Sequence, residues 1–126
     1  RAVLEGVALS LLDSKRYLEG LNIPHNDFAV AIGGGTKGRL WRQITSDVLG
    51  ITLTTNKSSD SSFGSAMLAG VACGVFASPK DAVEHCVKPD TVTHPNLENT
   101  AKYSEIFETY KKIHDMLAPI YHEKKI

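Results

Sequence analysis

The sequence lacks an excess of either charge, a long hydrophobic segment and a closely spaced cysteine pattern. Its 126 residues include 14 Lys plus Arg and 14 Asp plus Glu, so no global field attracts nucleic acid or a membrane surface. The longest uncharged apolar run, residues 63–77, is shorter than the roughly 20 residues that span a bilayer. Cys73 and Cys86 stand apart, which predicts reduced, buried thiols. Together these features predict a soluble cytoplasmic protein without a nucleic-acid or membrane partner.

The N-terminal segment begins abruptly. A helical pattern is already under way at residue 2, without a signal peptide or a capping residue before it. We therefore expect residues 1–126 to form one domain of a longer protein, truncated at its N-terminal edge. Within this first helix, residues 2–19, we expect a buried stripe, closed by Gly20 in the left-handed conformation. The stripe consists of Leu4, Ala8, Leu11 and Leu18.

The rest of the chain alternates between strand and helix patterns. Residues 28–32 form a continuous apolar run, typical of a strand covered on both faces, and residues 51–55 form a second, β-branched strand. We expect helices over residues 38–49 (with Gly50 as the cap), 63–75, 79–87 and 98–121, and an extended segment over residues 88–97. This order predicts an α/β fold with two parallel strands joined by a right-handed crossover. Because two strands make a poor sheet, we expect further strands from upstream sequence or from a second copy in a homo-oligomer.

Three consecutive glycines, residues 33–35, stand between the first strand and the following helix. Glycines there leave the backbone N–H groups uncovered and permit φ > 0, and the next helix points its positive end at the same place. This arrangement suits a nucleotide phosphate. Lys37, Arg39 and Arg42 either attract an anion or form a solvated face. A tight connection without any ligand is the alternative.

Two familiar phosphate-binding motifs compete for this loop. Gly33, Gly35 and Gly38 satisfy G-x-G-x-x-G, the dinucleotide fingerprint. However, the second strand ends at residues 54–56 (TTN), without the acidic residue that would bind a ribose, and an NAD-binding Rossmann fragment stays open as an alternative. The G-x-x-x-x-G-K-[ST] phosphate loop is excluded, because residues 39–40 are Arg and Leu where Lys and Ser or Thr are required.

The glycine loop is followed by further motifs in a fixed order. Residues 33–43 read GGGTKGRLWRQ, residues 47–50 read DVLG and residues 63–69 read FGSAMLA, while residues 1–13 read RAVLEGVALSLLD. The last helix carries Tyr103, Phe107 and Tyr110 on one face, with Leu117 further along it. These motifs resemble the C-terminal domain of the FGGY carbohydrate kinases, closest to xylulose kinases, and the resemblance covers nearly the whole chain. In that family a G-G-G/A loop leads into a helix ending Q-x-x-A/S-D-x-x-G, and an L-G-A-A-x-L-A helix follows.

The resemblance implies an actin-like, or ribonuclease H-like, ATPase fold. It also implies a parent enzyme that transfers phosphate from ATP, with Mg²⁺, to a ketose or polyol such as xylulose. In the family, the catalytic Asp and most sugar contacts precede the part that this chain matches. The chain is therefore expected to hold no catalytic residue and no metal ligand, to be inactive alone, and to need an N-terminal sugar-binding domain as its partner. The nucleotide-binding residues carried over from the family are Gly33, Gly34, Gly35, Thr36, Gly38 and Gln43.

Two positions depart from the pattern of the family. Gly38 stands where the family commonly has Ser or Asn facing the adenine, and Ser59 stands where it often has Glu. Gln43 matches the family but lies inside the expected helix, where its role could be structural. A non-catalytic actin-like interaction module is a further alternative, in which the small-residue helix and the last helix form a pairing surface. No position in the sequence identifies the sugar.

Overall fold

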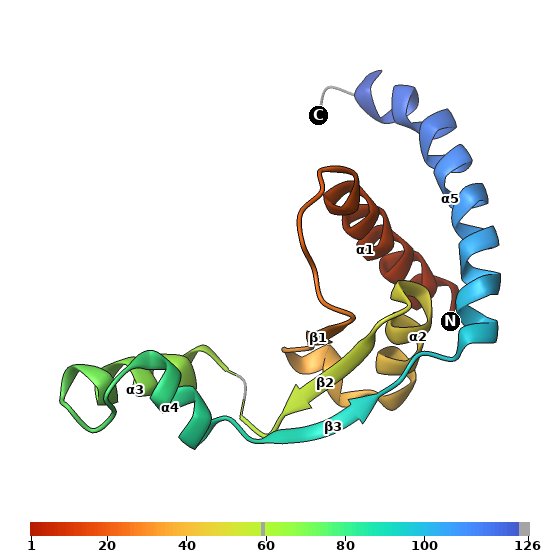
Figure 1. Ribbon diagram of the computed structural model, residues 1–126. Coiled ribbons are helices and arrows are strands. Elements are labelled where there is room, and N and C mark those ends of the chain that lie inside the picture. Colours follow the sequence, from red (N-terminus) through yellow and green to blue (C-terminus); the bar gives the residue numbers. More distant parts are fainter. Residues whose placement is uncertain (59, 124–126) are drawn as a thin grey trace.

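The computed structural model describes residues 1–58 and 60–123, with side chains up to residue 121. Ser59 and its comparison with the family lie outside the described residues. The helices are α1 (Ala2–Gly20), α2 (Arg39–Leu49), α3 (Ser61–Ala72), α4 (Pro79–Cys86) and α5 (Leu97–Glu123) (Figure 1). The strands are β1 (Phe28–Val30), β2 (Thr52–Asn56) and β3 (Pro89–Thr93), and a short 3-10 turn, η1, covers Gly34–Lys37.

The three strands form one sheet in the order β1-β2-β3. Phe28 of β1 pairs with Thr52 in a parallel register, so the predicted parallel pair is confirmed. β3 runs antiparallel to β2, with Leu53 opposite Thr93, where the sequence indicated only an extended segment. The register shifts near Pro89, because proline has no N–H for a ladder hydrogen bond and is tolerated at a strand end or an edge. The α/β fold is therefore as expected, with one additional strand.

The hydrophobic core lies between three helices rather than between helices and the sheet. The buried core side chains come from α1, α2 and α5: Ala8, Leu9, Leu12, Ile44, Val48, Tyr103 and Phe107. The predicted stripe of α1 is correct at Ala8 and wrong at Leu11 and Leu18, which are exposed. The apolar residues of α1 are compatible with either of two buried faces, one with Leu11 and Leu18 and one with Leu9 and Leu12. Packing of α2 and α5 against α1 buries the face with Leu9 and Leu12.

The ends of α1 and α2 are set by residues in the left-handed region. Gly50 caps α2 with φ 64, as predicted. The prediction that Gly20 caps α1 is wrong, because Gly20 is helical and Asn22 takes φ 54 instead. The N–H of Ile23 then donates to the carbonyl of Leu18, which is the long bond of a Schellman motif. Asparagine tolerates this conformation better than most residues, so the left-handed residue lies two positions later than expected and α1 extends to Gly20.

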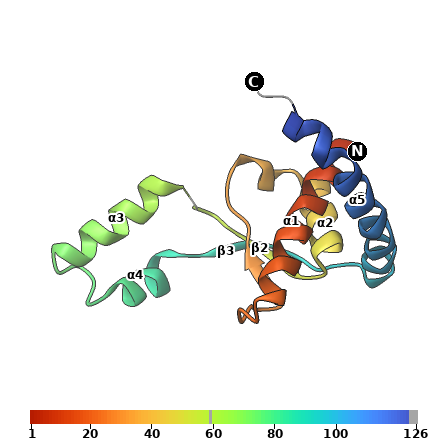
Figure 2. The ribbon, with the colours of Figure 1, turned by 90° about the horizontal axis from the view of Figure 1, so that it is seen from above.

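Helices α3 and α4 form an arm on the opposite side of the sheet from α1, α2 and α5 (Figures 1 and 2). β2 and β3 lie between this arm and the helical body. Ser78 caps α4 and precedes a proline at its first turn, as the sequence predicted. No residue of α3 is buried, and Cys73 at its end is exposed. The expected burial of Cys73 is therefore wrong, although both cysteines are free thiols.

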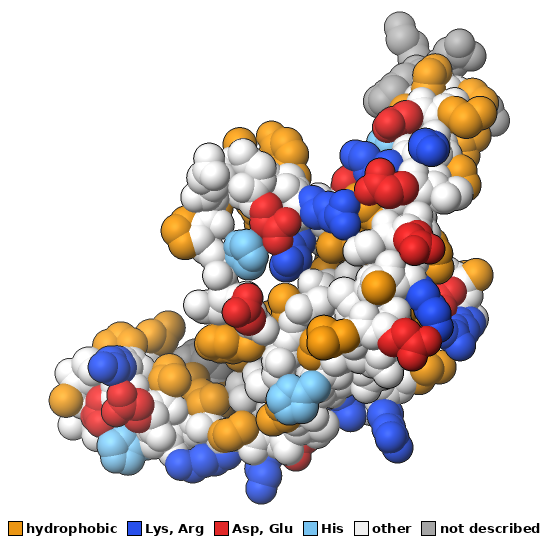
Figure 3. All heavy atoms as spheres, turned by 45° about the vertical axis from the view of Figure 1, so that its right-hand side comes forward, with side chains coloured by type: hydrophobic (Ala, Val, Ile, Leu, Met, Phe, Trp, Pro, Cys, Tyr) orange, Lys and Arg blue, Asp and Glu red, His pale blue; other side chains and the backbone are white. Residues whose placement is uncertain are grey.

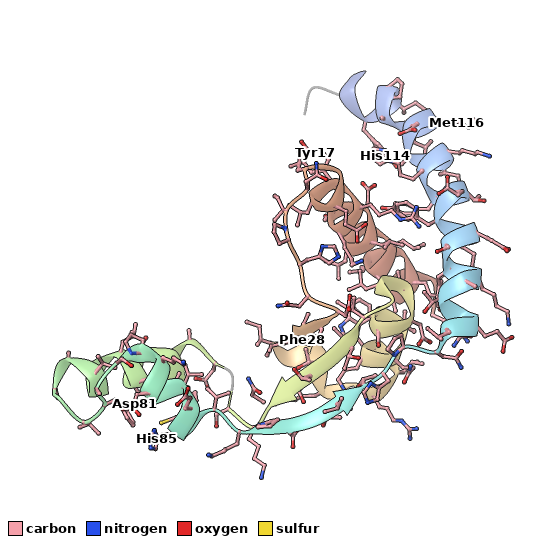
Figure 4. The ribbon with its side chains drawn as sticks, viewed as in Figure 1. Tyr17, Phe28, Asp81, His85, His114 and Met116 are labelled. Carbon is pink, nitrogen blue, oxygen red and sulfur yellow. The ribbon has the colours of Figure 1, made fainter. Side chains whose placement is uncertain are left out.

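The β1 side of the sheet is open in the described part of the chain. The strand was expected to be covered on both faces, yet Phe28, Val30 and Ile32 are 56%, 50% and 66% exposed. Figure 4 shows Phe28 on β1, between the helical body and the arm. Among the described helices, α5 included, none has the length and apolar character needed to cross a membrane.

Candidate functional site

The glycine loop folds into a tight turn that follows β1 directly. Gly33 takes φ 94, a conformation that only glycine adopts without strain, and η1 begins at the next residue. Thr36 closes the turn, since its N–H and its hydroxyl both donate to the carbonyl of Gly33, at 3.2 and 2.7 Å. Gly34 and Gly35 are the first residues of η1, so no carbonyl within η1 stands early enough in the chain to accept a hydrogen bond from their N–H groups.

An open pocket of about 640 Å³ lies beside this turn. One wall comes from the glycine turn and α2, and the other comes from the end of β2, the segment after it, and β3. The lining residues are Gly33, Gly34, Thr36, Lys37, Arg42, Thr55, Asn56, Lys57, Ser58, Asp60, Asp90 and Thr91. A Cβ atom added at Gly33 or Gly34 would meet no atom within 4 Å, so the backbone there faces open space.

The other glycines of the loop pack against an indole ring instead. A Cβ atom at Gly35 would lie 3.3 Å from Nε1 of Trp41, and one at Gly38 would lie 3.7 Å from Cβ of the same residue. Neither glycine lines the pocket. Gln43 also points elsewhere, because its Nε2 donates to Asp47 and to the carbonyl of His94. Of the six residues taken from the family, the structure brings Gly33, Gly34 and Thr36 to the pocket, and the nucleotide role of all six stays a prediction.

Charged side chains of both signs line the pocket, with cations in excess. The cations are Lys37, Arg42 and Lys57, and the anions are Asp60 and Asp90. Arg42 also holds the turn, because its Nη1 donates to the carbonyl of Thr36. The sequence pointed to Lys37 and Arg42 but missed Lys57 and Asp90, since no local pattern indicates that β2 and β3 meet at this place.

Asp60 is tied to the start of α3. Its carboxylate accepts hydrogen bonds from the hydroxyl of Ser62 and from the N–H of Phe63, at 2.7 and 2.8 Å. These two donors, the hydroxyl first, hold the pKa of Asp60 below its usual value. Within residues 1–58 and 60–123 no three His, Cys, Asp or Glu side chains gather as a metal site.

A second, larger hollow of about 1000 Å³ lies between α1 and α5. Ion pairs cross it: Arg16 with Glu108 at 3.3 Å and Lys111 with Asp13 at 3.2 Å. Arg16 also lies over the ring of Phe107, 4.5 Å from its centre. Figure 3 shows basic and acidic side chains alternating along α5. These two ion pairs therefore join α1 and α5 across the hollow.

Comparisons with known proteins identify the family. Residues 1–73 match the profile of the FGGY family of carbohydrate kinases, C-terminal domain. A xylulose kinase of Staphylococcus epidermidis is 34% identical over 115 residues, which cover 90% of this chain and 23% of that protein. An autoinducer-2 kinase of Salmonella typhimurium is 32% identical, covering 90% of this chain and 22% of that protein. The chain thus spans about a quarter of the length of the curated relatives it matches.

Solved structures agree with the sequence relatives. The structure is similar to ligand-bound xylulose kinase and to gluconate kinase of Lactobacillus acidophilus, each with a TM-score of 0.85 over 98% of this chain and 25% of that chain, at 27% and 26% identity. It is also similar to glycerol kinase of Plasmodium falciparum with ADP, with a TM-score of 0.71 and 25% identity, over 89% of this chain and 23% of that chain.

These matches place the fold in the class of actin-like ATPase domains. Within that class, the chain belongs to the FGGY family of carbohydrate kinases and corresponds to their C-terminal domain. The glycine spacing that satisfies the dinucleotide fingerprint is therefore no evidence for a Rossmann fold, and the family resemblance drawn from the motifs is confirmed.

Proposed function

We propose that this chain is the nucleotide-binding part of an ATP-dependent carbohydrate kinase that phosphorylates a ketose or polyol such as xylulose. The proposal is supported by family membership and by the xylulose kinases among the relatives and solved structures. The solved glycerol kinase with ADP supports nucleotide binding by this fold. Autoinducer-2 kinases are nearly as similar to the chain as xylulose kinases are, at 32% and 34% identity.

The observation that carries the nucleotide assignment is the bare backbone at Gly33 and Gly34. Both glycines line the pocket and have open space where a side chain would stand. A phosphate can therefore approach the N–H groups of the turn closely, which side chains would prevent. Lys37 and Lys57 supply positive charge beside the same opening. Gly35 and Gly38 are assigned the role of shaping the turn around Trp41.

Phosphoryl transfer requires more than this chain offers. The reaction needs a carboxylate that accepts the proton of the sugar hydroxyl, and Mg²⁺ to neutralise the phosphates. Since no metal-ligating cluster occurs in the described residues, we propose that Mg²⁺ is held by the phosphates of ATP and by the remainder of the full-length protein. The catalytic Asp and a sugar-binding domain are likewise assigned to that remainder. Sugar-dependent ADP release by the purified 126-residue chain would contradict this division.

The substitution Gly34→Val in the full-length protein tests the nucleotide site. A Cβ atom at this position meets open space, so we expect the fold to accept valine, whose side chain stands where we place the phosphate. We expect a loss of ADP affinity of at least about tenfold by calorimetry, comparable to removing one or two charge-assisted hydrogen bonds, with the affinity for D-xylulose retained. Gly20→Val is the matched control, because Gly20 also has open space around it and does not line the pocket.

Three outcomes would count against the proposal. Unchanged ADP affinity in Gly34→Val would show that the turn does not contact the nucleotide. An equal loss of ADP and D-xylulose affinity would show that the glycine serves folding alone. A wild-type protein that binds neither would favour the non-catalytic interaction module.

A further inference from the structure

We infer that Asp47 is a positioning residue, which holds α2 and the glycine turn at its start in register with the opposite wall of the nucleotide pocket. The inference rests on the proposed function in one respect only, namely that the pocket binds a nucleotide. The role of Asp47 in placing the turn can be tested without any ligand.

Asp47 is a buried carboxylate that accepts three hydrogen bonds. Its side chain is on α2, and the residue is 3% exposed. Oδ1 accepts from Nε2 of Gln43 and from the backbone N–H of Asn96, both at 2.8 Å. Oδ2 accepts from Nδ2 of Asn99, also at 2.8 Å. Two of the three donors therefore belong to the start of α5, 49 and 52 residues further along the chain.

The electrostatic environment makes this carboxylate depend on the start of α5. Asp47 lies near the C-terminal end of α2, where the helix dipole disfavours a negative charge. Its donors Asn96 and Asn99 lie at the N-terminal end of α5, where the dipole favours one. Asn96 itself caps α5 by accepting from the N–H of Glu98 at 3.0 Å. Two of the three hydrogen bonds that stabilise the charge on α2 therefore depend on the start of α5 staying in place.

Two neighbouring side chains of α2 bind the same segment. Nε2 of Gln43 donates to the carbonyl of His94 at 3.0 Å. The hydroxyl of Ser46, a fully buried residue, lies 3.3 Å from the carbonyl of Thr93 and 2.7 Å from that of Ile51. Gln43, Ser46 and Asp47 thus fasten α2 to residues 93–99, the connection from β3 to α5. This assignment also explains why Gln43 points away from the pocket.

The two elements that these hydrogen bonds join, α2 and the connection at residues 93–99, lead to the two opposite walls of the pocket. On one side, Arg42 of α2 holds the carbonyl of Thr36 in the glycine turn. On the other side, Asp90 and Thr91 of β3 line the pocket directly before the fastened connection. Apolar packing of α2 against α1 and α5 is non-directional, so it tolerates a small sliding of the helix. The hydrogen bonds from α2 to residues 93–99 have fixed geometry and do not tolerate it, so they set the distance between the walls.

The test reverses one hydrogen bond and then restores it. Asn99→Asp places a second carboxylate against Asp47, and the two repel each other. The double variant D47N/N99D restores an amide–carboxylate pair, with the donor and the acceptor exchanged. In the single variant D47N, the amide oxygen at position 47 still accepts from Gln43 and Asn96. Rotation of the Asn99 amide by 180° would then let its oxygen accept from the new amide nitrogen, which restores a bond between positions 47 and 99. Tyr103→Phe is the matched control, since it removes a partly buried hydrogen bond between α1 and α5 and leaves the hydrogen bonds of α2 in place.

Two readouts are made on the full-length protein. Hydrogen exchange reports the turn itself, through the amides of Thr36, Gly38 and Arg42, which are bonded within the turn and the first turn of α2. ADP affinity by calorimetry reports the pocket. In Asn99→Asp we expect exchange at these amides to accelerate by about tenfold and ADP affinity to fall by about as much, corresponding to one hydrogen bond to a charged group. Both changes should revert in D47N/N99D and be absent in Tyr103→Phe.

Each outcome decides one of the two proposals. Unchanged exchange at the turn in Asn99→Asp, or equal acceleration in Tyr103→Phe, would overturn the positioning role and leave Asp47 with general stability alone. Exchange that responds as expected in a protein that binds no ADP would support the positioning role and overturn the nucleotide assignment. A double variant that fails to recover would show that the negative charge of Asp47, rather than its hydrogen bonds, holds the connection, which also contradicts the inference.

Discussion

The hydrogen bond between Tyr103 and Glu5 provides a sharp test of how α1 is joined to α5. The hydroxyl of Tyr103, a residue that is 6% exposed, donates to Oε1 of Glu5 at 2.8 Å. The same oxygen accepts from Nε of Arg1, also at 2.8 Å. Tyr103→Phe removes the donor and leaves the ring in place, so it creates no large cavity. The variant therefore isolates one hydrogen bond to a charged group.

The expected cost at pH 7 is about 1–2 kcal/mol, at the low end for a hydrogen bond to a charged group. The low end applies because the Glu5 side chain is 27% exposed, so water replaces part of the lost bond. A local opening of α1 from α5 should then become about 5–30 times more frequent. Native-state hydrogen exchange of the amides of α1 and α5 measures this opening directly in the full-length protein.

The pH dependence follows from the direction of two pKa shifts. The hydrogen bonds from Arg1 and then Tyr103 hold the pKa of Glu5 below its usual value. The contribution of Glu5 is therefore present above its unfolded pKa of about 4.3, and it is lost as the pH falls through the folded value. Burial, followed by the bond to Glu5, raises the pKa of Tyr103, so its contribution persists at neutral pH and is lost only as the pH rises through that raised value.

The cost of Tyr103→Phe should thus decrease as the pH falls through the folded pKa of Glu5, because the acceptor loses its charge. Glu5→Gln supplies the matched background, in which the cost should be small throughout a pH titration. A cost that stays constant while Glu5 is titrated in the folded protein, or that is unchanged in the Glu5→Gln background, would refute this account of the contact.

Two further predictions concern helix ends. Gly50→Ala should destabilise the end of α2 by about 1–2 kcal/mol, because Gly50 has a positive φ and the added Cβ would lie 3.2 Å from Cγ2 of Thr100. Adding Thr100→Ser should recover part of this loss, because it removes Cγ2. Hydrogen exchange in α2 that is the same with and without Thr100→Ser would contradict the contact. Asp60→Ala should speed exchange at the first turn of α3 at pH 7, since Phe63 loses its acceptor. Because the folded pKa of Asp60 is lowered, chiefly by Ser62, this difference should disappear as the pH falls through that value, and Asp60→Asn should behave nearly as the wild type.

Local features of the chain were predictable where one residue type admits one conformation. Gly50 follows an amphipathic stretch and takes the left-handed cap, and Ser78 with Pro79 begins α4. The end of α1 was not predictable in this way, because both Gly20 and Asn22 tolerate the left-handed region and the hydrogen bonds of the last turn selected Asn22. Likewise β3 contains Pro89 and becomes a strand only by pairing with β2.

Of the candidate site, one wall of the pocket was predictable from the sequence and the other was not. The glycine turn was visible in the sequence, since β1, three glycines and α2 are consecutive. Its opposite wall was not, because Lys57 and Asp90 are distant in sequence from the turn and no periodicity indicates that they meet it. The motif also suggested that all three glycines face a ligand, whereas Trp41 packs where a side chain of Gly35 would stand.

The sequence by itself determined the family, the order of the main elements and the bare backbone of the glycine turn, since each depends on neighbouring residues and on the steric freedom of glycine. Only the tertiary structure decided which glycines face open space, which side chains complete the pocket, and that Asp47 joins α2 to the start of α5. Those features depend on contacts between residues up to 52 positions apart, whose directions and distances are set by packing rather than by any local pattern.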